Sequence, residues 1–452
     1  MSRTRHLASA VLIAASAATP LVAQKNSALD RTKVPTAGTP AALRVPAWTK
    51  AKLSNGAELI VSEKHNLPLV SFRITFIGGS NQFEPAGKTG LAGITASMLT
   101  EGTTHRNGDQ LSNDLQMLGT NIGVQVSGEN GFMTFQATKD KFLPALNLFA
   151  DVLLDPTFPQ EALDRLRGRQ IVQLTQVRDR TAGIASLVYP KLLYGADHPY
   201  GHVVSESSLQ SITRNDVESF YKTYFEPGRA VITVVGDVNR DDVKSEIEKA
   251  LAGWKSGGSV PSFNYPAAPP AKSRTIYLID KPGAAQSTFT IGEVGPARST
   301  PDYYALRVMN EMLGVLFQSR LNHNIREVKG YSYGVGSSFA FGRGPGAFRA
   351  GGEIVTAKSD SALIEFMKEL NDIRGPRPPS DDELQQAKAS LVQSLPAAFE
   401  SVNGVNGAIS SIYAQGLPED YYQQFAKAIN AVTKDDVVRV AKQYIDPIIS
   451  RF

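Results

Sequence analysis

Histidine offers the clearest capacity for metal or acid–base chemistry in this sequence, yet one pair alone has useful spacing. The chain has no cysteine and six histidines, of which only His198 and His202 stand four residues apart. Two imidazoles at that spacing share a zinc ion when they project from one face of a helix. Pro199 and Gly201 lie between them and break such a helix. We therefore expect two loop histidines and no metal.

A serine and a glycine-rich run are the other candidates, and each lacks the companions that its chemistry requires. Ser97 has no glycine elbow around it and no assignable histidine, which argues against a serine nucleophile. Residues 342–346, Gly-Arg-Gly-Pro-Gly, have no helix start and no lysine of a phosphate-binding loop. We interpret this run as a hairpin turn, with a mobile peptide-contacting loop as the alternative.

Residues 90–103 carry the most specific pattern in the chain, Gly-Leu-Ala-Gly-Ile-Thr-Ala-Ser-Met-Leu-Thr-Glu-Gly-Thr. The apolar residues recur at helical spacing, which predicts an amphipathic helix. The stretch resembles the zinc helix of the pitrilysin/insulinase family of metallopeptidases, where Gly-Leu-Ala leads into His-x-x-Glu-His and Gly-Thr follows. In this chain, residues 90–92 match the Gly-Leu-Ala that precedes the motif, and residues 102–103 match the Gly-Thr that follows it. The resemblance places Gly93 and Ser97 at the two histidine positions, and Ala96 at that of the general-base glutamate.

The family's third zinc ligand is a glutamate on the long helix after the metal helix. When this sequence is aligned with the family pattern through Arg178-Asp179-Arg180, Gln173 occupies that position, to within one helical turn. Glycine, serine and a neutral amide are poor zinc ligands, and alanine cannot accept a proton from a metal-bound water. We expect this chain alone to bind no metal and to contain no catalytic residue.

Further segments match the same family in order and spacing, so the resemblance covers nearly the whole mature chain. They are residues 194–201, 234–237, 280–283 with Gln286, and 320–333. In the family, an arginine and a tyrosine seven residues apart reach from the second half to the substrate backbone. Arg326 and Tyr333 match that spacing.

Their side-chain chemistry suits the role that the resemblance implies. A guanidinium offers fixed donors to peptide carbonyl groups, and a phenol can donate to a developing oxyanion. The alternative is a helix-end arginine in a surface ion pair and a tyrosine packed inside a strand. Tyr331 is a second tyrosine to consider, because it would face the same side as Tyr333 in a regular strand.

The elements that must position these residues follow from hydrophobic periodicity and turn signals. Before residue 253 we expect a hairpin at 52–63, strands at 69–77, 121–127, 132–137 and 230–235, and helices at 108–118, 141–154, 159–178, 182–193, 215–224 and 241–252. Residues 253–273 are rich in Pro, Gly and Ser and mark a domain boundary. Beyond it the order repeats, with strands at 275–280 and 286–293, a helix at 303–316, a hairpin around 342–346 and two helices.

Two helix starts support an internal duplication. Residues 157–167 and 377–388 both place a proline-containing cap and acidic residues before a long helix. We interpret the repeat as a duplicated α+β unit of roughly 200 residues, with two unrelated domains as the alternative. The expected fold class is α+β, with two homologous sandwich-like halves, each a mixed sheet covered by helices. They occupy residues 48–252 and 274–452, and residues 253–273 link them.

The N-terminus indicates export. Arg3 and Arg5 precede an apolar run and then small residues up to Ala23, which is typical of a cleaved signal peptide over residues 1–23, with Ala17 as the rival cleavage position. Residues 24–47 follow as an expected flexible leader. The run is too short to span a bilayer, and no later run of about 18 apolar residues occurs. A periplasmic protein without a membrane span is the expectation.

The overall composition is that of an ordinary globular protein, with 42% hydrophobic and 20% charged residues. The net charge is +4, and it becomes smaller when the basic signal peptide is removed. A charge this close to zero gives no reason to expect nucleic acid binding.

Loss of the metal set and retention of Arg326 and Tyr333 imply, through the resemblance, a catalytically incomplete subunit of a heterodimeric zinc metallopeptidase. Its partner would be a homologous chain that bears His-x-x-Glu-His and the zinc, and the pair would cleave peptide substrates. The alternative is a non-proteolytic structural or peptide-binding scaffold with the same fold. An independent enzyme with a new site has little support, since the sequence offers no cluster of titratable residues for it.

Overall fold

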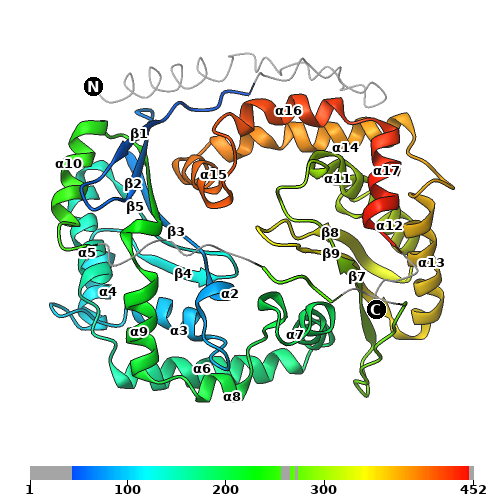
Figure 1. The fold of residues 1–452 in the computed structure, drawn as a ribbon, viewed down its shortest axis with the longest axis horizontal. Helices are drawn as coiled ribbons and strands as arrows, with labels where there is room; N and C mark the ends of the chain where they lie inside the picture. The colour runs from blue at the N-terminus through cyan, green and yellow to red at the C-terminus, as the bar shows by residue number, and fades with distance from the viewer. Residues whose placement is uncertain (1–42, 256–264, 270–272, 447–452) are drawn as a thin grey trace, which may run out of the picture. The chain divides into compact units, whose positions relative to one another are not determined.

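The computed structural model describes residues 43–255, 265–269 and 273–446 (Figure 1). The expected signal peptide, most of the expected leader and much of the expected linker lie outside these ranges. Within them, two β-sheets form the centres of the two halves, which we define as the elements from β1 to α10 and from β7 to α17.

The first half contains a six-stranded mixed sheet in the order β1-β2-β6-β3-β5-β4, here called sheet 1. Only the β2–β6 pair is parallel. Every residue of β6 is buried, as expected for a central strand with helices on both faces. The strands are β1 (Thr49–Lys52), β2 (Glu58–Glu63), β3 (Leu69–Ile77), β4 (Gly123–Ser127), β5 (Asn130–Thr138) and β6 (Ala230–Gly236).

Helices cover one face of sheet 1 over a core of aliphatic and aromatic side chains. Phe72, Phe135 and Phe149 lie with ring centroids 5.0–5.5 Å apart at its centre. The α-helices are α2 (Ser80–Phe83), α3 (Leu91–Met98), α4 (Gly108–Met117), α5 (Phe142–Leu154), α6 (Gln160–Arg178), α7 (Thr181–Tyr194), α8 (Glu206–Gln210), α9 (Arg214–Tyr224) and α10 (Arg240–Ala250). The short 3-10 turns are η1 (Lys139–Lys141), η2 (Pro199–Gly201) and η3 (Pro227–Arg229).

The second half contains a three-stranded antiparallel sheet in the order β7-β9-β8, here called sheet 2. Its strands are β7 (Gln286–Val294), β8 (Ser332–Phe339) and β9 (Ala347–Val355). Its helices are α11 (Tyr303–Asn310), α12 (Arg320–Asn322), α13 (Ser359–Asp372), α14 (Asp381–Gln393), α15 (Val402–Gln415), α16 (Tyr421–Ala431) and α17 (Lys434–Tyr444). The π-helical turns η4 (Glu311–Val315) and η5 (His323–Val328) and the 3-10 turns η6 (Thr356–Lys358) and η7 (Leu395–Phe399) complete it.

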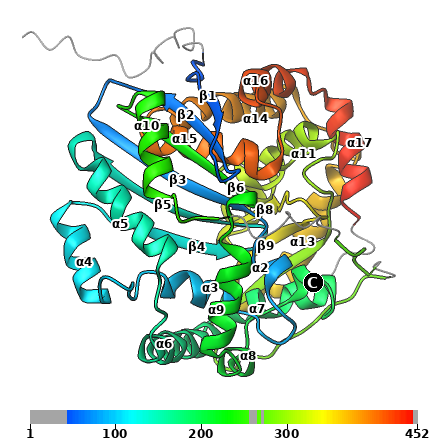
Figure 2. The ribbon, with the colours of Figure 1, turned by 60° about the vertical axis from the view of Figure 1, so that its left-hand side comes forward.

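The two halves exchange one helix each. Helices α7 and α15 both have fourteen residues, and each packs against the sheet of the other half (Figure 2). On α15, Asn406 Nδ2 donates to the carbonyls of Ser71 and Thr233 at 3.1 and 3.0 Å. On α7, the Tyr189 hydroxyl donates to the carbonyl of Phe348 at 3.1 Å. The halves are therefore held together through buried contacts on both sheets.

Most of the elements expected from the sequence are confirmed, and one strand is wrong. Residues 276–280 belong to no strand, although their sequence pattern matches that of β2. The physical reason is the lack of a partner, because β2 pairs on both edges whereas no strand of the described chain flanks residues 276–280. The short helices α2 and α8 were not expected, and five helices follow β9 where the sequence predicted two. None of the helices in the described ranges has the length and hydrophobicity needed to cross a bilayer.

Candidate functional site

Helix α3 carries the positions that the resemblance assigns to zinc. It begins after Gly90, whose φ of 106° lies in the left-handed region that favours glycine. The side chain of Glu84 closes the start of the helix, since its Oε1 accepts from the Gly90 and Ala92 amides at 3.0 and 2.9 Å. This capping fixes the direction in which the following turn of α3 presents its side chains.

Gly93 and Ser97 lie one turn apart on an open side of α3. Ser97 is exposed, and its hydroxyl donates back to the Gly93 carbonyl at 3.0 Å. A Cβ added at Gly93 would meet no atom of the described residues within 4 Å, so none of them fills the space of the missing side chain. Ala96 is buried at 2% exposure. Gln173 is exposed on α6, and α6 packs against α3.

These four residues do not fit a zinc ion. They supply a hydroxyl that is already bonded within its own helix and a neutral amide, with no imidazole or carboxylate. The structure brings α3 and α6 together, but it gives this chain no ligand set and no general base at that place.

The Glu84 carboxyl group that caps α3 should make the stability of the folded chain depend on pH. Burial raises the pKa of Glu84 to about 7, against the opposing hydrogen bonds from Ala92 and Gly90. The folded state therefore holds this proton more tightly than the unfolded chain, and stability falls as the pH rises from about 4.5 through 7.

Glu84→Gln keeps an acceptor oxygen and removes the buried charge. We expect the variant to be more stable than the parent at pH 8 by up to about 3 kcal/mol, with little difference at pH 4.5. Urea unfolding at the two pH values measures both quantities. Glu84→Ala is the control, because it removes the acceptor and should destabilise at either pH. An equal gain for Glu84→Gln at both pH values would contradict the assignment.

Arg326 and Tyr333 are the residues that the resemblance assigns to substrate binding. The side chain of Tyr333 is 87% exposed. It lies in β8 at an irregularity of the β8–β9 register between Ser332 and Val335. Ser332 Oγ accepts from the Gly334 amide at 3.0 Å, which fixes this bend. A bulge of this kind turns a side chain away from the regular pleat.

The alternative that packs Tyr333 inside a strand is therefore wrong. The expected equivalence with Tyr331 also fails, because Tyr331 precedes the strand and is partly buried against the core of the second half. The register irregularity, invisible in the sequence, separates the two tyrosines.

Arg326 lies in η5, half exposed, seven residues before Tyr333. Its Nε is 3.1 Å from Glu327 Oε1, and its guanidinium carbon is 4.5 Å from the centre of the Phe317 ring. The surface ion pair that the alternative expected is thus present, alongside a cation–π contact. Phe317 is 60% exposed, so the guanidinium is braced by an open aromatic face.

Exposed apolar residues gather on the segments that carry Arg326. Val315, Phe317 and Val328 are 52%, 60% and 63% exposed. Exposed apolar groups in close sequence are a recognised mark of an interaction surface. Sequence reasoning did not identify these three residues, because a helical segment gives no sign of which apolar side chains lack a cover.

His198 and His202 are loop residues, as expected, and they flank the 3-10 turn η2. His198 is buried, and its Nδ1 accepts from the Tyr200 amide while its Nε2 contacts the Pro266 carbonyl, both at 3.0 Å. Burial lowers the pKa of His198, so the neutral ring is favoured. His202 is exposed, and it belongs to no group of three or more metal-ligating side chains among the described residues.

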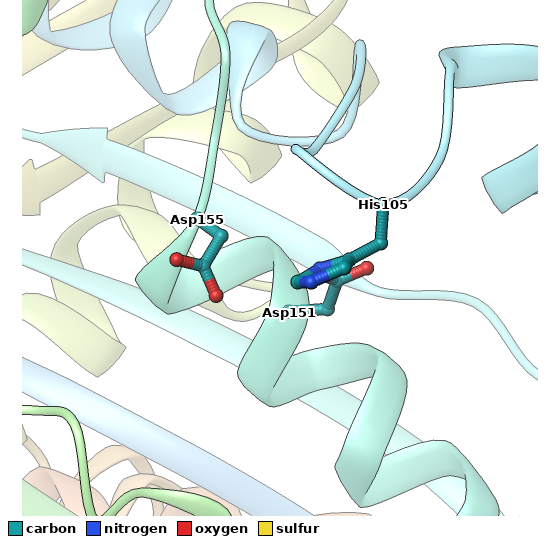
Figure 3. A group of neighbouring side chains, drawn as sticks. All are labelled: His105, Asp151 and Asp155. Carbon is teal, nitrogen blue, oxygen red and sulfur yellow. The ribbon is translucent and has the colours of Figure 1, made fainter.

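His105 forms a group with Asp151 and Asp155, which is drawn in Figure 3. The ligand atoms of His105 and the two aspartates lie within 4.8 Å of one another. Asp151 already accepts from His105 Nδ1 at 2.6 Å, from Thr103 at 2.8 Å and from Arg106 Nη1 at 2.9 Å. Burial alone would raise the pKa of Asp151, but these hydrogen bonds hold it below its usual range. With an arginine on the same carboxylate, the group is a structural ion pair and not a cation site.

The glycine-rich run at 342–346 joins β8 and β9, so the hairpin interpretation is confirmed. Its backbone amides at Arg343 and Gly344 donate to the Glu129 carboxylate at 2.6 and 3.2 Å. Tyr200 donates to the same carboxylate. Side chains at positions 342 and 344 would collide with Glu129, Tyr200 and Tyr265, which explains why glycine stands there. The turn joins the two halves.

Comparison with known proteins gives a consistent picture. Residues 59–190 match the family model described as insulinase (peptidase family M16), and residues 211–391 match the model described as the peptidase M16 inactive domain. Between them the two models cover most of the described chain.

Individual relatives are distant but cover almost the full length. An uncharacterised zinc protease of Rickettsia felis is 22% identical over 88% of this chain and 95% of its own length. A non-peptidase homologue, YmxG, of Helicobacter pylori is 22% identical over 87% of this chain and 91% of its own. The crystal structure of a peptidase M16 inactive domain from Pseudomonas fluorescens has a TM-score of 0.81 and 25% identity, over 89% of this chain and 97% of that one.

Proposed function

This chain belongs to the insulinase family of peptidases, family M16, as an inactive member, and from that premise we propose that it completes the active site of a homologous zinc-bearing partner. The exposed Tyr333, held out of the β8–β9 ladder at 87% exposure, is the observation that carries the proposal. A tyrosine that is 87% exposed is available for a ligand.

Arg326 and Tyr333 supply the chemistry of the proposed role. Arg326 offers guanidinium donors to the carbonyl groups of an extended peptide, and its contact with Phe317 limits its rotation. Tyr333 offers a phenolic donor to the oxygen on which negative charge develops during hydrolysis. The partner would contribute the metal and the general base, which Gly93, Ala96 and Ser97 do not.

The proposed partner is a homologous chain that bears His-x-x-Glu-His, in a heterodimer that acts on peptides. Exposed Val315, Phe317 and Val328 provide apolar surface that a partner or a peptide would cover. The signal-like sequence of residues 1–23 supports a periplasmic location. Neither proposal requires this chain to hold zinc.

A scaffold without a part in proteolysis is the second candidate. It is favoured by the relative that is named a non-peptidase homologue, since the same fold is then used without hydrolysis. In that role Arg326 and Tyr333 would be ordinary surface residues, and their replacement would have no effect on the complex.

The test is to purify this chain alone and together with a His-x-x-Glu-His homologue encoded near it, and to measure cleavage of a quenched fluorescent peptide. We expect chelator-sensitive activity only in the mixture. Tyr333→Phe in this chain should lower kcat by about 100- to 1000-fold, as removal of one oxyanion donor does. Arg326→Ala should lower kcat/KM, because it removes donors to the peptide carbonyl groups. Tyr331→Phe is the matched control and should leave the rate unchanged.

Three outcomes would decide otherwise. Zinc-dependent cleavage by this chain alone would show that α3 is misaligned with the metal helix. Full activity of the mixture with both substitutions would favour the scaffold. Equal losses from Tyr331→Phe and Tyr333→Phe would point to disturbance of β8 instead of contact with the substrate.

A further inference from the structure

Arg73 is a partly buried arginine in the middle of sheet 1. Its neighbours in β3, Phe72 and Ile74, point into the main core of the first half. Because successive side chains of a strand alternate between faces, Arg73 points to the opposite face, which α15 covers in part. There its guanidinium carbon lies 4.3 Å from the centre of the Phe132 ring, so one side of the charged group rests on an aromatic face.

Arg73 has no ion-pair or hydrogen-bond partner among the described residues. Its Nε is buried and unpaired, and its Nη1 and Nη2 donate to no described atom. Burial lowers the pKa of Arg73, with no charged neighbour acting against this effect. Removing a charged group from water without giving it a partner is costly, so the side chain is suited to bind a compensating group.

The surroundings of Arg73 explain why it lacks a partner. Thr134 and Thr233 stand directly opposite it in the two neighbouring strands. Helix α15, which packs on this face, contains no charged residue. Ser71 and Thr75 lie two positions away on the same face, and their buried hydroxyls also lack a hydrogen-bond partner within the described chain. These neighbours supply hydroxyl groups and no carboxylate.

Arg320 shows how this chain satisfies an arginine that it buries. Its Nε and Nη2 donate to the two carboxylate oxygens of Glu383 at 2.7 and 2.9 Å, and its Nη1 donates to the Arg377 carbonyl at 2.6 Å. Such a forked pair matches the guanidinium group in both charge and geometry. Arg73 lacks the carboxylate of such a pair.

We propose that Arg73 binds a carboxylate of the peptide on which this chain acts, which makes acidic peptides its preferred ligands. The carboxylate accepts from Nη1 and Nη2, while Phe132 holds the guanidinium plane in place. The choice of a peptide as the source of the carboxylate rests on the proposed function, whereas the lack of an acid follows from the contacts of Arg73 alone. Arg326 and Tyr333 serve the peptide backbone in that function, and Arg73 adds a preference among peptides.

Three labelled peptides test the proposal on the full chain, without a partner. The first is fluorescein-Gly-Ser-Val-Thr-Glu-Val-Thr-Ser with a C-terminal amide, the second has Gln in place of its Glu, and the third is the Gln peptide with a free C-terminal carboxylate. We expect fluorescence anisotropy to show that at least one acidic peptide binds about tenfold or more tightly than the neutral one, as expected for a hydrogen bond between charged groups. Preference for the first peptide assigns an acidic side chain to Arg73, and preference for the third assigns a C-terminus.

Arg73→Met separates ligand binding from a structural role. Methionine keeps an apolar contact with Phe132 and removes the charge. We expect the preferred acidic peptide to bind this variant about tenfold more weakly or worse. The Tm of the free protein should stay the same or rise, because an unpaired, partly buried charge is removed. Arg178→Met is the matched control, since Arg178 is exposed at the end of α6, and it should leave binding unchanged.

Three results would overturn the proposal. They are equal binding of the acidic and neutral peptides, no binding of either acidic peptide, and a lower Tm of Arg73→Met, which would mean that Arg73 already has a structural partner. These failures differ from failure of the proposed function. Cleavage by the mixture without a preference for acidic peptides would remove only the role of Arg73. Binding of acidic peptides without cleavage by the mixture would leave Arg73 in a peptide-binding scaffold.

Discussion

The combined substitutions Gly93→His, Ser97→His and Gln173→Glu are expected to create a site for a single zinc ion between α3 and α6. Positions 93 and 97 lie one turn apart on an open side of α3, and an added Cβ at 93 meets no atom. Position 173 is exposed on the helix that packs against α3. Two imidazoles and a carboxylate with one open coordination position form a known catalytic zinc set.

Titration calorimetry and metal analysis after dialysis measure this gain. The matched control is the double substitution without Gln173→Glu, which offers two ligands and should bind at least tenfold more weakly. Ala96 is left unchanged, so no general base is added and peptide hydrolysis is not expected. If the triple variant binds no more zinc than the parent chain, Gln173 is not the position of the third ligand.

Ile409→Asp should produce the largest loss of stability, about 4 kcal/mol or more. Ile409 is 1% exposed in the core that α15 forms with Ile60, Val231 and Val235 of sheet 1. A carboxylate there has no cation among these neighbours and must be buried unpaired or must displace the helix. Since α15 belongs to the second half, the substitution should weaken the joint between the halves.

Urea unfolding followed by circular dichroism gives the change in the free energy of unfolding. Ile364→Asp on α13 is the control, because that isoleucine is 68% exposed and should tolerate the charge within about 0.5 kcal/mol. Comparable losses at the two positions would mean that α15 does not seal sheet 1. Limited proteolysis should cut the Ile409→Asp chain between the halves faster than the parent.

Sequence reasoning reached the fold class and most element positions because the first-half strands and helices have strong periodicity. Strand β3 at 69–77 and helix α6 close to 159–178 are examples. It failed at residues 276–280, where the pattern of a strand is present and no described strand lies alongside as a partner. Pairing is a long-range property, and local composition does not encode whether a neighbour exists.

The candidate residues show the same limit. The identity of Gly93, Ala96 and Ser97 was enough to predict the loss of two zinc ligands and of the general base, since that prediction depends on side-chain chemistry alone. The distinction between Tyr331 and Tyr333 depended on a bulge, and the bond of Glu129 to the turn at 342–346 joins residues far apart in the chain. No pattern within either segment announces such contacts.

The exchange of α7 and α15 has a consequence for biosynthesis. Sheet 1 is complete once β6 has been made, yet its second face stays uncovered until residues 402–415 leave the ribosome. At about 5–20 residues per second, that delay lasts roughly ten seconds or more. During that time the apolar face formed by Ile60, Val231 and Val235 would remain open to chaperones that bind unfinished chains.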